Sequence, residues 1–91
     1  MTRARGGAPL TLQEVAEELA RRMACQVEPG DDPWAVKVNG PGYHFVVATF
    51  FGGWQATVYL PDKAPVTFYA EAVEMLELRL KAKLAGLDAN F

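Results

Sequence analysis

The stretch YHFVVATFFGGWQATVYL, residues 43–60, decides the fold because two runs rich in strand-forming residues flank a pair of glycines. Valine, phenylalanine, tyrosine and threonine favour β-strands, and Gly52-Gly53 can adopt the positive φ angles of a type I′ hairpin turn. Residues that oppose each other across a hairpin point to the same face of the sheet. The expected facing pairs are Phe51 with Trp54, Thr49 with Ala56, Val47 with Val58, and Phe45 with Leu60.

The segment before this hairpin adds a third strand with the same sidedness. WAVKV, residues 34–38, is joined to the hairpin by NGPG, residues 39–42, which we interpret as a four-residue loop. The facing pairs are then Val38 with Tyr43, Val36 with Phe45, and Trp34 with Val47. Both loops place these apolar residues on one face, and this agreement predicts a three-stranded antiparallel meander.

Helical patterns flank the three strands. In LTLQEVAEELARRM, residues 10–23, Thr11 and Glu14 have the spacing of a capping box. In APVTFYAEAVEMLELRLKAKLAGL, residues 64–87, a long apolar stripe predicts a second helix that ends at Gly86. The two stripes are Leu12, Val15, Leu19 and Met23 in the first helix, and Tyr69, Val73, Leu76, Leu80, Leu84 and Leu87 in the second.

The order α-β-β-β-α predicts an α+β fold, a two-layer sandwich in which both helices pack on one face of the three-stranded meander. The length of 91 residues suits a single core. We expect a flexible N-terminal tail over residues 1–8, one domain over residues 9–87, and a C-terminal tail over residues 88–91.

The composition argues against several classes of function. The net charge of −2 gives no long-range field that would attract nucleic acid or an anionic membrane, and no apolar run reaches the ~18 residues of a membrane span. Cys25 is the only cysteine, which fits a reducing, cytoplasmic location. The chain has no serine, and His44 is its only histidine. We therefore expect no catalytic residues, no metal site, no cofactor and no small-molecule substrate.

The three strands also have a second face, opposite the core, and it is rich in apolar residues. Its apolar members are Ala35, Val46, Ala48, Phe50 and Tyr59, and its polar members are Lys37, His44, Gln55 and Thr57. A separate stripe on the second helix consists of Phe68, Met75, Leu78 and Ala82. This stripe either packs against the first helix or is available to a partner. The candidate interface residues are Lys37, His44, Val46, Phe50, Gln55, Tyr59, Met75 and Leu78.

An edge strand offers another route to association, because its backbone groups on one side are unpaired. Residues 54–60 carry no charge, whereas the first strand carries Lys37 and lies between Pro33 and Pro41. We expect any dimer that extends the sheet to form through residues 54–60.

These observations favour a small non-enzymatic protein that binds another protein, or its own copy, through the second sheet face or the second helix. Aromatic side chains surrounded by smaller residues suit the centre of an interface, so Tyr59 and Phe50, with Val46, are the expected anchors. Small proteins without strong charge or catalytic groups are common among inhibitors encoded by phage and mobile elements, including anti-CRISPR proteins. An inhibitor of this kind is our hypothesis for the biological role.

The order of elements and the sequence GPGYH, residues 40–44, resemble the double-stranded-RNA-binding domain over roughly residues 10–87. The resemblance is one of topology, and fold alone does not imply RNA binding. A rival hypothesis is nucleic-acid binding in which Arg3 and Arg5 contact phosphates and Phe50 and Tyr59 of the second sheet face stack on bases. In that family a lysine cluster at the start of the second helix contacts phosphates. The matching stretch here, APVTFYAEAVE at residues 64–74, has no basic residue. Nucleic-acid binding is therefore the alternative function.

Overall fold

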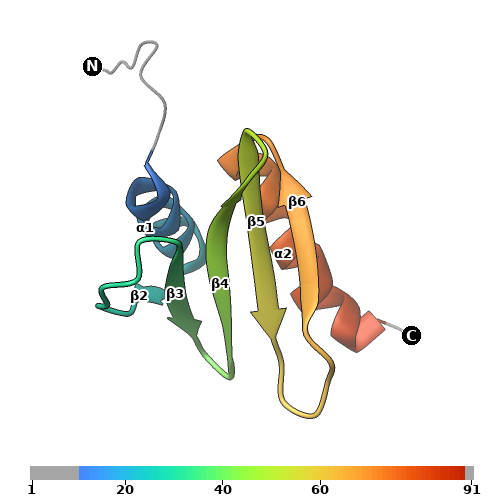
Figure 1. Cartoon of the computed structure of the whole chain (residues 1–91). Helices are drawn as coiled ribbons and strands as arrows, with labels where there is room; N and C mark the ends of the chain where they lie inside the picture. Colours follow the sequence, from blue (N-terminus) through green and yellow to red (C-terminus); the bar gives the residue numbers. More distant parts are fainter. Residues whose placement is uncertain (1–10, 90–91) are drawn as a thin grey trace.

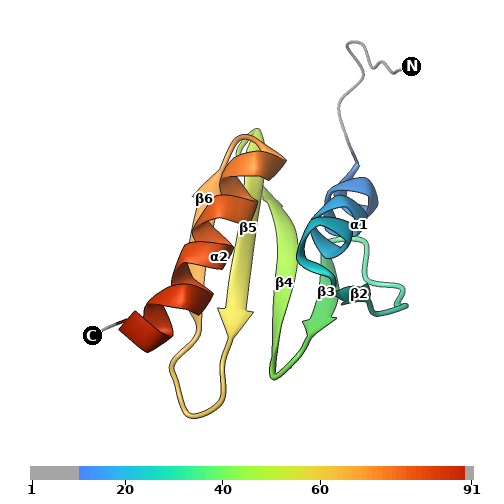
Figure 2. The same cartoon turned by 180° about the vertical axis from the view of Figure 1, so that it is seen from behind.

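The computed structural model of the 91-residue chain describes residues 11–89, with side chains described for residues 11–85. Its elements are α1 (Leu12–Met23), β2 (Gln26–Val27), β3 (Ala35–Gly40), β4 (Tyr43–Phe50), β5 (Gly53–Tyr59), β6 (Val66–Ala70) and α2 (Val73–Ala89). The strands form one antiparallel sheet in chain order, and both helices lie on the same face of it (Figures 1 and 2). The expected α+β fold is confirmed, but the sheet has five strands instead of three. The tail expected at residues 1–8 lies outside the described residues.

The N-terminus of α1 has the capping box that the sequence predicts. The Thr11 hydroxyl accepts a hydrogen bond from the Glu14 backbone N–H at 3.1 Å, and the Glu14 carboxylate accepts one from the Thr11 N–H at 2.8 Å. These two bonds satisfy backbone donors that have no partner inside the helix. The helix ends at Ala24, whose φ of 56° turns the chain toward β2.

The strand β6 contradicts the predicted order of elements. Residues 66–70 were expected to form the first turns of a long helix, but they pair with β5 along its length. The sequence VTFYA combines β-branched and aromatic residues, and alternate side chains point to opposite faces as a strand requires. Because β5 is paired with both β4 and β6, residues 54–60 are not an edge, and the dimer expected through them is wrong.

The boundaries of α2 also differ from the prediction. The helix begins at Val73 and continues past Gly86 to Ala89, so the helix end expected at Gly86 is wrong. With a strand at residues 66–70 and the short strand β2 after α1, the order is α-β-β-β-β-β-α. The likeness to the double-stranded-RNA-binding domain therefore holds for only part of the topology.

Both hairpins pair two residues away from the predicted register, because each turn is shorter or earlier than expected. Val47 faces Ala56 instead of Val58, and Val36 faces Val47 instead of Phe45. The turn residues are Pro41-Gly42 and Phe51-Gly52, with φ of 80° at Gly42, 42° at Phe51 and 82° at Gly52. A shift of two residues keeps every side chain on the same face of a strand. The predicted division into an inner and an outer face is therefore confirmed.

Two large aromatic residues that were predicted to lie on the core face are exposed instead. Phe51 lies in the β4–β5 turn and is 94% exposed, so it does not pair with Trp54. Trp34 precedes β3 and is 77% exposed; its backbone N–H donates to the Asp32 carboxylate at 2.8 Å in a local turn, so Trp34 does not continue the strand. The core expected from the sequence is smaller by these two rings.

The core lies between the sheet and the two helices. Its buried members are Val15, Ala16, Leu19 and Ala20 of α1; Val38, Phe45, Val47, Ala56, Val58 and Leu60 of the sheet and the turn after β5; and Val73, Leu76 and Leu80 of α2. No charged or polar residue is buried among the described residues. Hydrophobic burial of this one face therefore stabilises the fold.

At one side of the core, Tyr43 and Cys25 form a polar contact under α1. The Tyr43 hydroxyl lies 3.1 Å from the Cys25 sulfur, and the sulfur also donates to the Met23 carbonyl at 3.4 Å. Burial, together with the contact to Cys25, raises the pKa of Tyr43 above its ordinary value. The neutral phenol is therefore the form that the folded state favours.

Replacing Phe51 by asparagine should increase the free energy of unfolding by about 0.5–1 kcal/mol. A φ of 42° places Phe51 in the left-handed region, which non-glycine residues adopt at a cost and asparagine tolerates best. Phe51→Ala is the matched control, because it also removes the exposed ring but keeps an ordinary Cβ. Urea unfolding measures both variants, and an asparagine variant no more stable than the alanine variant would contradict the prediction.

Replacing Tyr43 by phenylalanine should make stability less sensitive to alkaline pH. The raised pKa of Tyr43 contributes stability that is complete below the unfolded pKa of about 10 and is lost as the pH rises above it. The free energy of unfolding should therefore fall more steeply above about pH 10 in the wild type than in Tyr43→Phe. Urea unfolding at several pH values measures the two slopes, and equal slopes would show that the phenol does not contribute in this way.

Candidate protein-interaction surface

No helix covers one face of the sheet, which we call the outer face (Figure 1). It is formed by side chains of β3–β6 that point away from the helices: Ala35, Lys37, Asn39, His44, Val46, Ala48, Phe50, Gln55, Thr57, Tyr59, Thr67 and Tyr69. The sheet register arranges them in rows that cross the strands. Rings lie at both ends of the face, and smaller side chains lie between them.

At one end of the outer face, His44 and Tyr59 face each other across β4 and β5. Their rings are stacked, with centroids 4.7 Å apart and planes 15° from parallel. Tyr59 remains 37% exposed. This pair places an imidazole and a phenol side by side at this end of the outer face.

At the other end, Phe50, Phe51 and Tyr69 form what we call the hairpin-tip cluster. The centroid of the Phe50 ring lies 4.4 Å from that of Tyr69 and 4.7 Å from that of Phe51. Phe50 opposes Gly53, which has no side chain, so rings from β4 and β6 meet across β5. A hollow of about 260 Å³ adjoins the cluster, and Trp54 and Glu71 help to line it. Phe50 is 39% and Tyr69 49% exposed.

The middle of the outer face is uncharged. It consists of Val46, Ala48, Gln55, Thr57 and Thr67, most of them half-buried by their neighbours. The hydroxyls of Thr57 and Thr67 lie 2.8 Å apart and bond to each other. The centre of the outer face is therefore a mixed surface of small apolar and uncharged polar side chains between two aromatic ends.

The charge on the outer face is confined to its β2–β3 margin. Lys37 lies 3.6 Å from the Glu28 carboxylate, which also accepts a hydrogen bond from the Asn39 amide at 2.9 Å. The bond from Asn39 and the charge of Lys37 lower the pKa of Glu28, so this carboxylate stays ionised. The one lysine on this face is therefore paired, and no basic patch forms there among the described residues.

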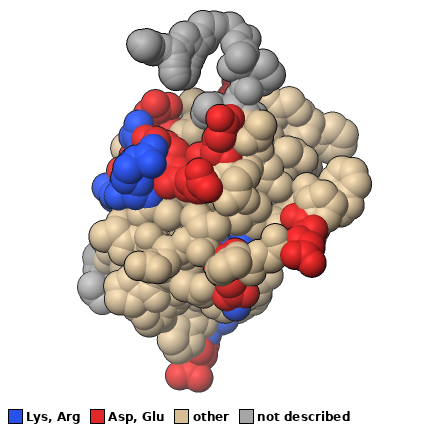
Figure 3. Space-filling model, turned by 90° about the vertical axis from the view of Figure 1, so that its left-hand side faces the viewer, with Lys and Arg blue, Asp and Glu red and all other residues tan. Residues whose placement is uncertain are grey.

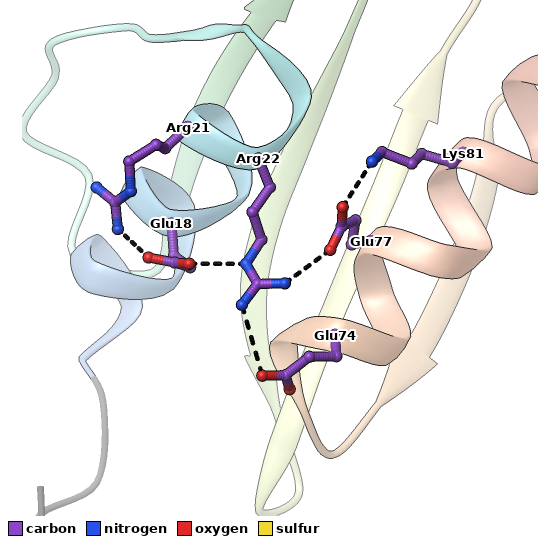
Figure 4. Close-up of polar contacts among 6 residues, drawn as sticks. All are labelled: Glu18, Arg21, Arg22, Glu74, Glu77 and Lys81. Atoms are coloured by element: carbon purple, nitrogen blue, oxygen red, sulfur yellow. Dashed lines mark hydrogen bonds and ion pairs between the residues drawn. The ribbon is translucent and has the colours of Figure 1, made fainter. Parts of the chain in front are cut away.

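The helical side of the molecule has a different character. In Figure 3, charged groups gather over α1. Arg22 of α1 contacts carboxylates on both helices: Glu18 at 2.7 Å, Glu77 at 2.8 Å and Glu74 at 3.6 Å (Figure 4). Lys81 contacts Glu77 at 2.6 Å. Hydrogen bonds from Lys81 and then Arg22 lower the pKa of Glu77, which keeps it charged within this network.

A hollow of about 530 Å³ lies beside this network, between α1, the N-terminal end of α2 and Trp54. Most of its charged lining belongs to Glu17, Glu18, Glu71 and Glu74, opposed by Arg21 and Arg22. No cluster of three or more histidine, cysteine or acidic side chains with the geometry of a metal site occurs in residues 11–85.

The structure brings most of the predicted interface residues together. Lys37, His44, Val46, Phe50, Gln55 and Tyr59 all lie on the outer face. Met75 and Leu78 lie on the opposite side of the molecule, 45% and 64% exposed on α2. Arg22 forms ion pairs between the helices, whereas Met75 and Leu78 are exposed and are not among the apolar residues packed against the core, so the alternative in which this stripe packs on the first helix is not supported.

Sequence reasoning missed two members of the hairpin-tip cluster, Phe51 and Tyr69. Tyr69 was assigned to a helix, although the alternation in VTFYA was a signal that could have found it. Phe51 was assigned to the core. Cys25 and His44 lie on opposite faces of the sheet, with Cys25 under α1 and His44 on the outer face.

Comparison of the chain with known protein families, with curated proteins and with solved structures finds no significant match. Neither of the described helices is long and apolar enough to cross a membrane.

Replacing Arg22 by methionine should lower the free energy of unfolding by about 1 kcal/mol, because its guanidinium on α1 pairs with two carboxylates of α2 and with one of its own helix. The loss should shrink in about 0.5 M salt, which screens surface charges. Arg21→Met is the matched control, because Arg21 pairs only with Glu18 of its own helix and should change stability little. Equal losses for both variants in urea unfolding would contradict a role for Arg22 between the helices.

Proposed function

We propose that this protein is a non-enzymatic binding protein that acts by contact between its outer face and another protein. One observation carries the proposal: both helices cover the same side of the sheet, so the other side exposes rings at both ends of an uncharged surface. Large apolar surfaces on monomers mark interaction sites more often than scattered apolar residues do.

The energetics of such a contact favour the aromatic ends. Tyrosine and phenylalanine supply large contact areas at a small cost in side-chain entropy, and they are enriched where binding energy concentrates. Phe50 and Tyr69 are already held against each other, and Tyr59 is held against His44. Because these rings are positioned before binding, less ordering is needed when a partner docks.

The partner of this proposal is a protein, and the role is inhibitory. A small protein that acts by contact alone can block a larger one by occupying its surface, as inhibitors encoded by phage and mobile elements do, including anti-CRISPR proteins. A self-complementary contact of two outer faces is the other form that the same surface allows.

Nucleic-acid binding is the second candidate, favoured by the exposed rings on an antiparallel sheet, on which bases could stack. Affinity for nucleic acid also depends on cations that neutralise phosphates. The outer face has only Lys37, and its charge is engaged by Glu28. Gel-shift assays at low salt with single- and double-stranded DNA and RNA test this candidate, and the absence of a shift would remove it.

Replacing Phe50 and Tyr59 together by alanine should reduce capture of the partner from a nuclease-treated lysate of the producing organism at least tenfold, which is about 1.4 kcal/mol. The matched control is Met75→Ala with Leu78→Ala, which removes two exposed apolar side chains from the helical side and should leave capture unchanged. Circular dichroism establishes that both variants are folded, and mass spectrometry quantifies the captured protein. If only the variant Met75→Ala with Leu78→Ala lost capture, the interface would lie on α2 and not on the outer face.

A further inference from the structure

The two edges of the sheet differ in how far they are protected. At the first edge, β2 is two residues long and is followed by the turn sequence EPGDDP, residues 28–33. At the other edge, β6 presents an unbroken run of five uncharged residues, Val66–Ala70, without proline. Alternate backbone N–H and C=O groups of an edge strand point outward and can pair with another strand. Among the described strands, β6 is therefore the open edge.

The helix α2 lies above this edge and turns a basic flank toward it. Val73, Leu76 and Leu80 face the sheet, and Glu74, Glu77 and Lys81 face α1 (Figure 4). With 3.6 residues per turn, Arg79 and Lys83 fall on the flank turned away from α1, on the β6 side. Within residues 11–85 neither side chain forms an ion pair. Two cationic groups are thus available along the open edge.

Side chains of β6 leave apolar surface on both faces at this edge. Phe68 points to the helical side and is half-buried against the core, and Tyr69 points to the outer face and is 49% exposed. A strand added beside β6 would cover the remaining surface of both rings. Backbone pairing and this burial would act together, as in other cases in which a peptide extends a sheet.

We propose that the β6 edge binds an extended acidic segment of a partner protein as a sixth strand. An apolar side chain of that segment packs against Phe68 under α2, and carboxylates on the same side of the segment pair with Arg79 and Lys83. The charge of this flank decides between occupants. A second copy of the chain, related by a two-fold axis beside β6, would bring its own Arg79 and Lys83 to the same seam, about 10 Å away. Like charges would then oppose the pairing, whereas an acidic segment attracts.

The test uses the full chain and two blocked heptapeptides, acetyl-TETVTET-amide and acetyl-TKTVTKT-amide. Each places its valine and both charged residues on one side of the strand, so the pair differs only in the sign of the charge. Titration followed by amide NMR should shift the signals of Val66–Ala70 with the glutamate peptide, and the lysine peptide should bind at least tenfold more weakly. In the variant Arg79→Glu with Lys83→Glu the preference should reverse.

Several results would overturn the proposal: no shift in β6 with about 1 mM glutamate peptide, shifts confined to other strands, or an unchanged preference in the charge-reversed variant. Concentration-dependent shifts of β6 without peptide, together with a dimeric mass, would assign the edge to a second copy. The variant Phe50→Ala with Tyr59→Ala should bind the glutamate peptide as the wild type does. Failure of the edge and failure of the outer face are therefore separate outcomes.

Discussion

The packing of both helices on one face of the sheet is the constraint on which the rest of the structure depends. Side chains of the strands therefore alternate between the buried helical side and the solvent-facing outer side, and all the fully buried side chains of the sheet lie on the helical side. Ion pairs of Arg22 connect the two helices on that side, so hydrophobic burial and ion pairing stabilise the same half of the molecule. On the opposite face, the aromatic residues Phe50, Tyr59 and Tyr69 remain 39%, 37% and 49% exposed.

The face to which each strand side chain points could be predicted from the sequence, because it depends only on alternation along the strand. An error of two residues in the strand pairing does not change it. The predicted pair of Val47 with Val58 was wrong, yet both residues are buried on the predicted face. The turn was misassigned for a reason that lies outside the hairpin. A Cβ at Gly53 would lie 2.8 Å from the Ala70 carbonyl oxygen, so this glycine is required by the approach of β6 and not by the turn. Phe51 takes the strained turn position in its place.

The sixth element shows the limit of periodicity in a short segment. Tyr69 and Val73 fit a helical stripe, and the same residues 66–70 also fit alternation, so pairing with β5 decided between the two readings. Six of the eight candidate interface residues share one face, because they occupy alternate positions in β3, β4 and β5. Met75 and Leu78 do not join them, since a two-layer molecule places its helices and its outer face on opposite sides.

We propose two separate surfaces for contact with proteins, the open sheet face and the β6 edge with its basic flank. The first of these proposals depends on the outer face being uncovered in the monomer. Thiol labelling of Thr57→Cys and Val58→Cys, each in a Cys25→Ala background, tests it with neighbouring residues of β5. The account predicts that the cysteine at position 57 reacts within about tenfold of the unfolded rate, and the cysteine at position 58 at least about a hundredfold more slowly. Equal protection of both cysteines in a monomeric sample would contradict it.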